Sequence, residues 1–311
     1  MPQTQGVSIP LGNLAEGRLI SRPNRFLAVV DLAGQTIQAH VPDPGRLEEL
    51  LFPENRVMVR NINAQLSSIK RKTQYDLVLA GFDDIWVCVD TRYPNRLFEQ
   101  AATEGALGEF SEYTSVHREV ALDQVSNRLD SRLGTPNWQN DTEGGNTARE
   151  SEGQSGGKTS TSTGNDGPAK DDNLKSANTR KARNTPKSRF DFMLEGPGKR
   201  PLLVEVKSVT LCIDGTGLFP DAPTERGARH LRELKEISSM GLDTCVVFIA
   251  QREDITSVSA NREMDPGFAQ ALDEAAQAGV KILAYRCCVS PYCIRLSPEP
   301  IPYQQFADGK R

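Results

Sequence analysis

Residues 202–211 read LLVEVKSVTL, an apolar, strand-forming stretch with two charges at its centre. Glu205 and Lys207 stand two positions apart, and side chains at positions i and i+2 of a strand lie on the same face. A carboxylate and an ammonium group therefore share one face of an element that is otherwise suited to burial. The stretch predicts either a structural salt bridge at a sheet edge or the working face of an enzyme.

A second charged strand precedes this one. SRFDFMLE (188–195) carries Asp191 near its middle, and GPGKRP (196–201) turns the chain between the two strands. Such a hairpin brings Asp191 beside Glu205. Two carboxylates suit a hard cation such as Mg²⁺ or Mn²⁺. Asp191 and Glu205 are therefore expected as metal ligands, and Lys207 is expected to hold the attacking water and to stabilise charge on a phosphate.

Two alternatives bear on this site. The simpler one is a Glu205–Lys207 pair at a sheet edge, with Asp191 capping a turn. The other replaces Asp191 by Asp130 in NRLDSRL (127–133), which has a similar Arg-x-Asp core. Asp130 is the weaker candidate, because it stands before a long polar segment and no short connection joins it to Glu205.

The remaining pattern predicts two groups of elements. Between residues 18 and 91, strands are expected at 25–32, 35–41, 56–62, 74–82 and 84–90, with a hairpin at Ala33-Gly34 and a short helical stretch at 46–52. Five strands at short spacing predict a small barrel or sheet, for which an oligonucleotide-binding (OB) barrel is one possibility. Further on, the expected elements are helices at 94–113, 225–240 and 265–279 and strands at 114–123, 189–211 (a hairpin), 243–251 and 280–290. This order predicts a mixed α/β sheet flanked by helices.

Residues 140–188 differ from the rest of the chain, because Leu174 is their one large apolar side chain. Such a segment cannot bury enough surface to offset the entropy of ordering, so we expect a disordered surface insertion between two strands. Basic residues collect at its end: 180–210 holds eight Lys or Arg against three acids, a local charge of 8 − 3 = +5. Other basic clusters are IKRK (69–72) and Arg18, Arg22 and Arg25 beside Phe26, a combination that suits stacking of single strands.

Composition limits the classes of function. The 311 residues carry a formal net charge of −4, so any contact with nucleic acid must use a local basic patch. Six cysteines form no CxxC pair, which argues against a zinc site and for free thiols. The sequence shows no signal peptide and no membrane span, so a cytoplasmic protein is expected. It also shows no helix-turn-helix, zinc-finger or RRM signature that would predict sequence-specific readout.

Three motifs, SRFDFML, VEVKSVTL and GLFPDAPTERGARHLREL, together resemble the sugar fermentation stimulation protein A family. RFLAVV, HVPDPGRL and DTRYPNRL (90–97) add to the resemblance. It implies an N-terminal OB-like domain at 1–91 and a PD-(D/E)xK nuclease-like domain at 92–311, in which Asp191, Glu205 and Lys207 match the Asp, Glu and Lys of the pattern. Two departures are the long insertion and Pro42-Asp43-Pro44-Gly45, where the family usually carries Pro-Asn-Thr-Gly.

Further contacts are expected around this site. The N-terminus of the helix at 225–240, capped by Asp221 or Thr224, points backbone N–H groups at an anion. The residues expected to contact nucleic acid are Arg226, His230, Arg25, Lys70, Arg71 and Lys72. Glu99, Glu104 and Glu119 are candidates for an additional acidic residue.

The sequence thus predicts a DNA-binding protein with a metal-dependent phosphodiesterase site. The alternative is a non-catalytic DNA-binding regulator linked to sugar fermentation genes, as the family name implies. In either case the expected partner is nucleic acid, DNA without strong sequence preference, while the oligomeric state is not indicated.

Overall fold

A computed structural model of the chain describes residues 6–62, 73–121 and 189–305, which all belong to one compact unit. The predicted insertion at 140–188, the basic residues Lys70, Arg71 and Lys72, and Asp130 lie outside the described residues.

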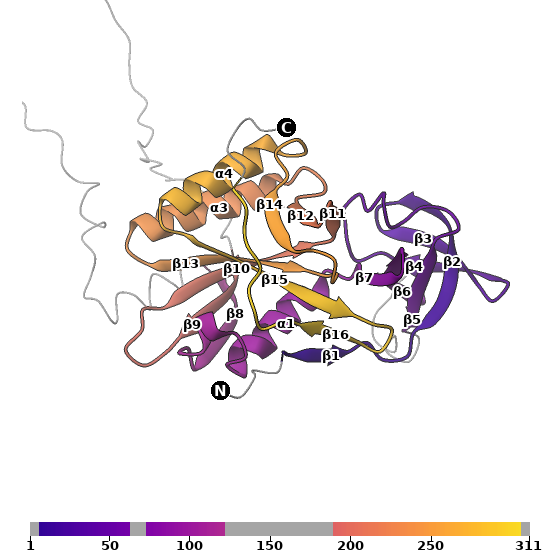
Figure 1. Cartoon of the computed structure of the whole chain (residues 1–311), viewed down its shortest axis with the longest axis horizontal. Helices are drawn as coiled ribbons and strands as arrows, with labels where there is room; N and C mark the ends of the chain where they lie inside the picture. The colour runs from indigo at the N-terminus through magenta and orange to yellow at the C-terminus, as the bar shows by residue number, and fades with distance from the viewer. Residues whose placement is uncertain (1–5, 63–72, 122–188, 306–311) are drawn as a thin grey trace, which may run out of the picture. The chain divides into compact units, whose positions relative to one another are not determined.

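Six strands form the N-terminal, OB-like barrel (Figure 1). They are β2 (Ala15–Asn24), β3 (Leu27–Leu32), β4 (Gln35–His40), β5 (Arg56–Asn61), β6 (Tyr75–Phe82) and β7 (Ile85–Cys88). Their order is β4-β3-β2-β5-β6-β7, and β4 closes onto β6 through the parallel pairs Ala39↔Tyr75 and His40↔Asp76. The predicted barrel is confirmed, and so is the β3–β4 hairpin, where Ala33 and Gly34 both have positive φ.

Two details of the barrel differ from the sequence-based expectation. Strand β2 was not among the predicted strands, because Leu19 is the one buried residue of its ten and no alternating pattern marks it. The short helix predicted at 46–52 is wrong. The N–H groups of Leu50 and Leu51 both bond to the carbonyl of Leu47, which makes a single turn.

The larger sheet carries the predicted charged hairpin. Its order is β1-β16-β15-β13-β10-β9-β8. The strands are β1 (Ser8–Pro10), β8 (Ser115–Ala121), β9 (Arg189–Glu195), β10 (Leu202–Val209), β13 (Asp243–Ala250), β15 (Lys281–Val289) and β16 (Cys293–Leu296). Strands β10, β13 and β15 are parallel, whereas β8, β9 and β10 are antiparallel. The mixed sheet is therefore confirmed, and β1 joins its edge from the start of the chain.

Helices cover both faces of this sheet (Figure 1). Helix α1 (Arg92–Thr103) packs Leu97 and Phe98 into one core with Val204 and Val206 of β10. The other face carries α3 (Glu225–Ser239) and α4 (Pro266–Gln277), which contact each other closely. A 3₁₀ turn, η2 (Gly108–Phe110), follows α1 within the predicted helix at 94–113.

The segment predicted as a Gly-rich loop at 215–224 contains a strand. β12 (Thr216–Phe219) pairs with β11 (Leu211–Ile213) and, in parallel, with β14 (Ser257–Ala260). Thr224 then caps α3 by accepting a hydrogen bond from the N–H of Gly227 at 3.0 Å, as one of the two expected caps. The cap matters for function, since it fixes where α3 begins relative to β10.

All six cysteines are free thiols, as expected. Among the described residues, no helix combines the length and the apolar character that a membrane crossing requires.

Candidate active site at the β9–β10 hairpin

Strands β9 and β10 separate at Asp191. The antiparallel pairs run from Leu202↔Leu194 to Val204↔Phe192, and Asp191 and Glu205 follow next on the two strands. The N–H of Val206 then donates to Oδ2 of Asp191 at 2.8 Å, so a side chain takes the place of a backbone carbonyl. This hydrogen bond places the Asp191 carboxylate beside the strand that carries Glu205 and Lys207, as the hairpin predicts.

Two side chains donate hydrogen bonds to Glu205. Its side chain lies in the core, 5% exposed, and its Oε1 accepts hydrogen bonds from Lys207 Nζ and from His230 Nδ1, both at 2.6 Å. Because an ionised carboxylate only accepts, His230 donates from Nδ1. The other oxygen, Oε2, is buried and has no hydrogen-bond partner among the described residues.

The two carboxylates differ in acidity. Burial by itself would raise the pKa of Glu205, but Lys207 and His230 outweigh it and lower the pKa to about 2. Burial raises the pKa of Asp191 to about 6, and the nearby charge of Glu205 adds to the shift. Hydrogen bonds from Val206 and Asn95 oppose it. At neutral pH both groups are therefore largely ionised, and the site carries more negative charge than Lys207 alone offsets.

His230 lies in the interior rather than on the surface. Helix α3 places it against Glu205, where it is 3% exposed, and its ring lies 6.2 Å from the ring of Phe190. The sequence pattern suggested that this residue contacts nucleic acid or orients the site. Its burial and its hydrogen bond place it against Glu205.

Asn95 belongs to the site and was missed from the sequence. Its Nδ2 donates to Oδ1 of Asp191 at 3.0 Å from helix α1. The acidic candidates lie elsewhere: Glu99 pairs with Arg118 at 3.0 Å, Glu104 accepts from Gln100 at 2.9 Å, and Glu119 is exposed. Asn95 belongs to the motif DTRYPNRL, which could have indicated it. It was passed over because the sequence was searched for an additional acidic residue, and asparagine is an amide.

The donor set fits a hard divalent cation. Oε2 of Glu205 is a buried acceptor without a donor, which costs free energy unless a ligand satisfies it. Asp191 supplies a second carboxylate whose oxygens each take one protein hydrogen bond. Nowhere in the described ranges do three His, Cys, Asp or Glu side chains gather as a metal cluster. A cation at Asp191 and Glu205 would therefore complete its shell with water or substrate oxygens.

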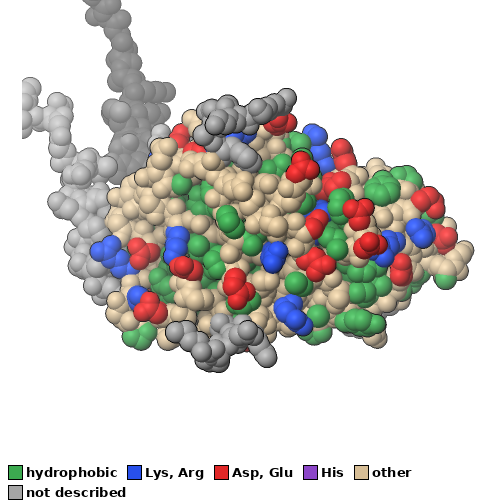
Figure 2. Space-filling model, in the orientation of Figure 1, with side chains coloured by type: hydrophobic (Ala, Val, Ile, Leu, Met, Phe, Trp, Pro, Cys, Tyr) green, Lys and Arg blue, Asp and Glu red, His purple; other side chains and the backbone are tan. Residues whose placement is uncertain are grey.

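The surface residues expected to contact nucleic acid are scattered. Arg226 is exposed in the first turn of α3. Arg25 is exposed on the barrel. The guanidinium of the nearby Arg22 donates hydrogen bonds to the carbonyls of Arg25, Gly45 and Arg46. On the face shown in Figure 2, basic and acidic side chains are interspersed and form no patch of one sign.

The loop that departs from the family pattern meets the start of α3. Asp43 is 7% exposed, and its Oδ1 accepts from the N–H of Gly45 at 2.8 Å. Burial, and then the charge of Asp221, raises the pKa of Asp43 to about 7. Asp221 in turn accepts from the N–H of Leu47 at 3.4 Å. The sequence HVPDPGRL thus contacts the motif GLFPDAPT directly.

A mixed α/β sheet with an Asp and a Glu-x-Lys at a splayed hairpin, joined to an OB-like barrel, defines the class of protein. Known proteins agree with it. A family profile described as the sugar fermentation stimulation protein RE domain matches residues 168–292, and one described as the SfsA N-terminal OB domain matches 20–89. The chain belongs to the sugar fermentation stimulation protein family.

Individual relatives cover nearly the whole chain. A sugar fermentation stimulation protein homolog from Moorella thermoacetica is 37% identical over 93% of this chain and 96% of its own. The homolog from Desulforamulus reducens is 35% identical over 96% and 95%. The solved structure of Pyrococcus furiosus SfsA in complex with Ca²⁺ is 21% identical, covers 96% of this chain and 98% of its own, and superposes with a TM-score of 0.66. At that identity it supports the fold.

Proposed function

We propose that this protein is a metal-dependent phosphodiesterase that acts on nucleic acid, with DNA as the expected substrate and Mg²⁺ or Mn²⁺ as the cofactor. The observation that carries the proposal is the convergence of three charged side chains at strand β10. Oε1 of Glu205 lies 2.6 Å from Lys207 Nζ, and the N–H of Val206, between them in sequence, donates to Asp191. A plain salt bridge accounts for Glu205 and Lys207. It leaves unexplained a half-buried second carboxylate and a buried Oε2 that has no hydrogen-bond partner among the described residues.

Each residue has a role in this scheme. Asp191 and Glu205 would hold the cation, which supplies Lewis acidity and neutralises charge at the phosphate. Lys207 would hold the attacking water and stabilise the negative charge that develops on phosphate oxygens. His230 and Asn95 would orient Glu205 and Asp191 through the hydrogen bonds described above.

The comparison with a relative supports a divalent cation. The Pyrococcus furiosus SfsA binds Ca²⁺ in its solved structure, and Ca²⁺ takes oxygen ligands as Mg²⁺ does. The carboxylates of Asp191 and Glu205 are oxygen donors of the same kind. We therefore place the cation of this protein at that pair.

A non-catalytic DNA-binding regulator is the second candidate. The observation that favours it is the contact between Asn95 and Asp191. A neutral amide lies beside this carboxylate, where a further acidic side chain would strengthen metal binding. In this case the constellation would hold the fold of the site, and the protein would bind nucleic acid without turnover.

Cleavage assays separate the two. Purified protein is incubated with single- and double-stranded DNA and RNA in Mg²⁺, in Mn²⁺ and in chelator. The variants are Asp191→Ala and Lys207→Ala, and the matched controls are Asp84→Ala and Lys281→Ala, which change exposed residues outside the site. Metal-dependent cleavage that is lost in both site variants and kept in both controls supports the enzyme.

Absence of cleavage on every substrate, together with binding that weakens as salt rises, supports the regulator. A protein that binds no nucleic acid at low salt contradicts both functions.

A further inference from the structure

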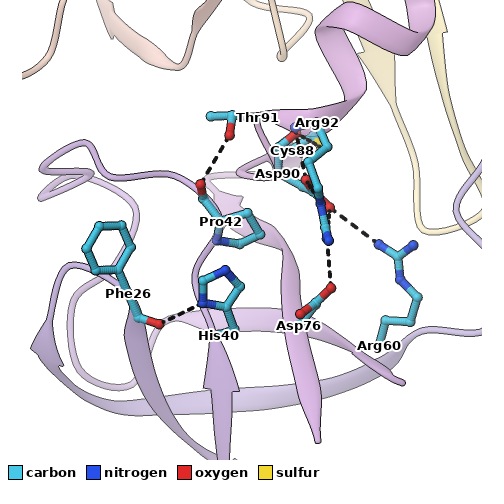
Figure 3. A network of polar contacts seen from close by, with 9 residues as sticks. All are labelled: Phe26, His40, Pro42, Arg60, Asp76, Cys88, Asp90, Thr91 and Arg92. Atoms are coloured by element: carbon cyan, nitrogen blue, oxygen red, sulfur yellow. Dashed lines mark hydrogen bonds and ion pairs between the residues drawn. The ribbon is translucent and has the colours of Figure 1, made fainter. Parts of the chain in front are cut away.

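Two hollows in the described part of the molecule share Thr91 as a lining residue. The larger is a cleft of about 930 Å³ along α1, with β1 on its other side. The smaller, of about 230 Å³, lies between the barrel loop at 43–45 and the segment 219–224 before α3. Thr91 lines both, and its hydroxyl donates to the carbonyl of Pro42 at 3.1 Å (Figure 3). The start of α1 is thus fixed against the barrel between the two hollows.

One lining residue, Asn95, connects the larger cleft with the candidate active site. Its side chain donates to Asp191. Arg96 and Arg118 line the cleft as well. Arg96 is exposed, lies over the ring of Tyr93 at 5.1 Å, and forms no ion pair with any described residue. Arg118 is about half exposed and pairs with Glu99. The carboxylates of Glu99 and Glu104 line this cleft too. Arg96 forms an ion pair with neither of them, so its guanidinium is available for a phosphate.

The smaller hollow leads to the barrel surface. Ser208, the residue after Lys207, lines it, and so does the exposed Arg25, together with the carboxylates of Asp43 and Asp221. Phe26 follows Arg25 and is 53% exposed. Its ring stacks with that of His40 at a centroid distance of 6.5 Å, and Figure 3 shows the two residues beside Pro42. An exposed aromatic ring next to an arginine is the arrangement that stacks an unpaired base and contacts its phosphate.

We propose that one single-stranded nucleic-acid segment occupies both hollows, with Arg96 contacting its phosphates on one side of the site and Arg25 and Phe26 binding it on the other. The inference rests on the proposed function, since it assigns the path of that function's substrate. The strand passes Thr91 and presents its backbone to Asp191. A duplex is excluded from this path, because its bases are paired and cannot stack on Phe26.

Binding of oligothymidylate tests the path, because this strand does not pair with itself. Affinity is measured in chelator, so that the strand stays intact, over a series of salt concentrations. The variants are Arg96→Ala, Arg25→Ala and Phe26→Ala, and the control is Arg232→Ala, an exposed arginine on α3. We expect each arginine variant to lower the salt slope by about 0.7. Phe26→Ala should weaken binding roughly tenfold with the slope unchanged.

The length of the strand provides the second measurement. Wild-type protein should bind long strands more tightly than short ones, and Arg25→Ala should lose that gain. Equal behaviour of Arg96→Ala, Arg25→Ala and the control overturns the path, as does tighter binding of a duplex than of its single strand. If wild-type protein binds no nucleic acid at all, the proposed function itself fails, and the variants then show no differences to interpret.

Discussion

His230 Nδ1 lies 2.6 Å from Glu205 Oε1, although 25 residues and a change from strand to helix separate them. The contact helps to keep this buried carboxylate ionised. Burial alone would raise the pKa of Glu205, but Lys207 first and His230 second outweigh burial and lower this pKa to about 2.

His230→Ala should therefore weaken metal binding. Oε1 of Glu205 would keep Lys207 as its one donor, and loss of an orienting group of this kind costs roughly 10–100-fold in metal affinity. His230→Asn should recover part of the loss, because its amide can donate from a similar position. Titration calorimetry with Mn²⁺ measures both. Arg229→Ala, which changes the exposed neighbouring residue, is the control. Unchanged affinity in His230→Ala would show that Lys207 suffices.

Asn95→Asp should make the protein more dependent on metal. The variant exchanges a hydrogen bond to Asp191 for a third carboxylate, which without a cation should cost about 1–3 kcal/mol of unfolding free energy. A divalent cation relieves the repulsion, so Mn²⁺ should raise the Tm of the variant more than that of the wild type. Gln100→Glu adds a carboxylate on the same helix, beside Glu104 and away from Asp191, and is the control. An equal rise in Tm in variant and wild type would contradict a cation at Asp191.

The charged hairpin could be predicted from sequence because its geometry is local. Fourteen positions separate Asp191 from Glu205, and alternation along a strand together with one turn determines which side chains meet. The cap of α3 at Thr224 also follows from neighbouring residues. These features depend on backbone periodicity, which a single sequence displays.

The remaining parts of the site depend on packing between distant elements. Asn95 reaches Asp191 across 96 positions, and nothing in the spacing of polar residues on α1 indicates which one faces β9. The sequence left open whether His230 meets phosphate or orients the site, and only the packing of α3, which turns it inward with Leu231 and Leu234, shows that it is buried. Strand β2 escaped prediction for the same reason, since its partners β3 and β5 rather than its own pattern define it.

Gly45→Ala should disturb the contact between the barrel loop and Asp221. A Cβ at this position would clash with the carboxylate of Asp221 and force it aside, at a cost of about 1–3 kcal/mol. If Asp221 is the obstacle, Asp221→Ala should remove most of the added cost in the double variant, which is then less destabilised than the sum of the single variants. Urea unfolding measures the free energies. Gly108→Ala meets no atom within 4 Å and is the control. Additive effects would exclude the contact as the cause.

Asp43→Asn should stabilise the protein at high pH and leave it unchanged at low pH. The folded state raises the pKa of Asp43 from 3.8 to about 7, through burial first and then Asp221. Folded protein therefore keeps a proton that unfolded protein releases between these values, so the contribution of Asp43 to stability falls as pH rises through this window and is constant above it. Asparagine keeps an oxygen for the N–H of Gly45 but has no proton to lose. Unfolding free energies of the variant should then match those of the wild type near pH 4 and exceed them by about 1–3 kcal/mol near pH 8.

Asp31→Asn, which changes the corresponding acceptor of the Gly34 N–H at the β3–β4 hairpin, is the control. A difference between variant and wild type that stays the same at both pH values would show that Asp43 does not hold the proton.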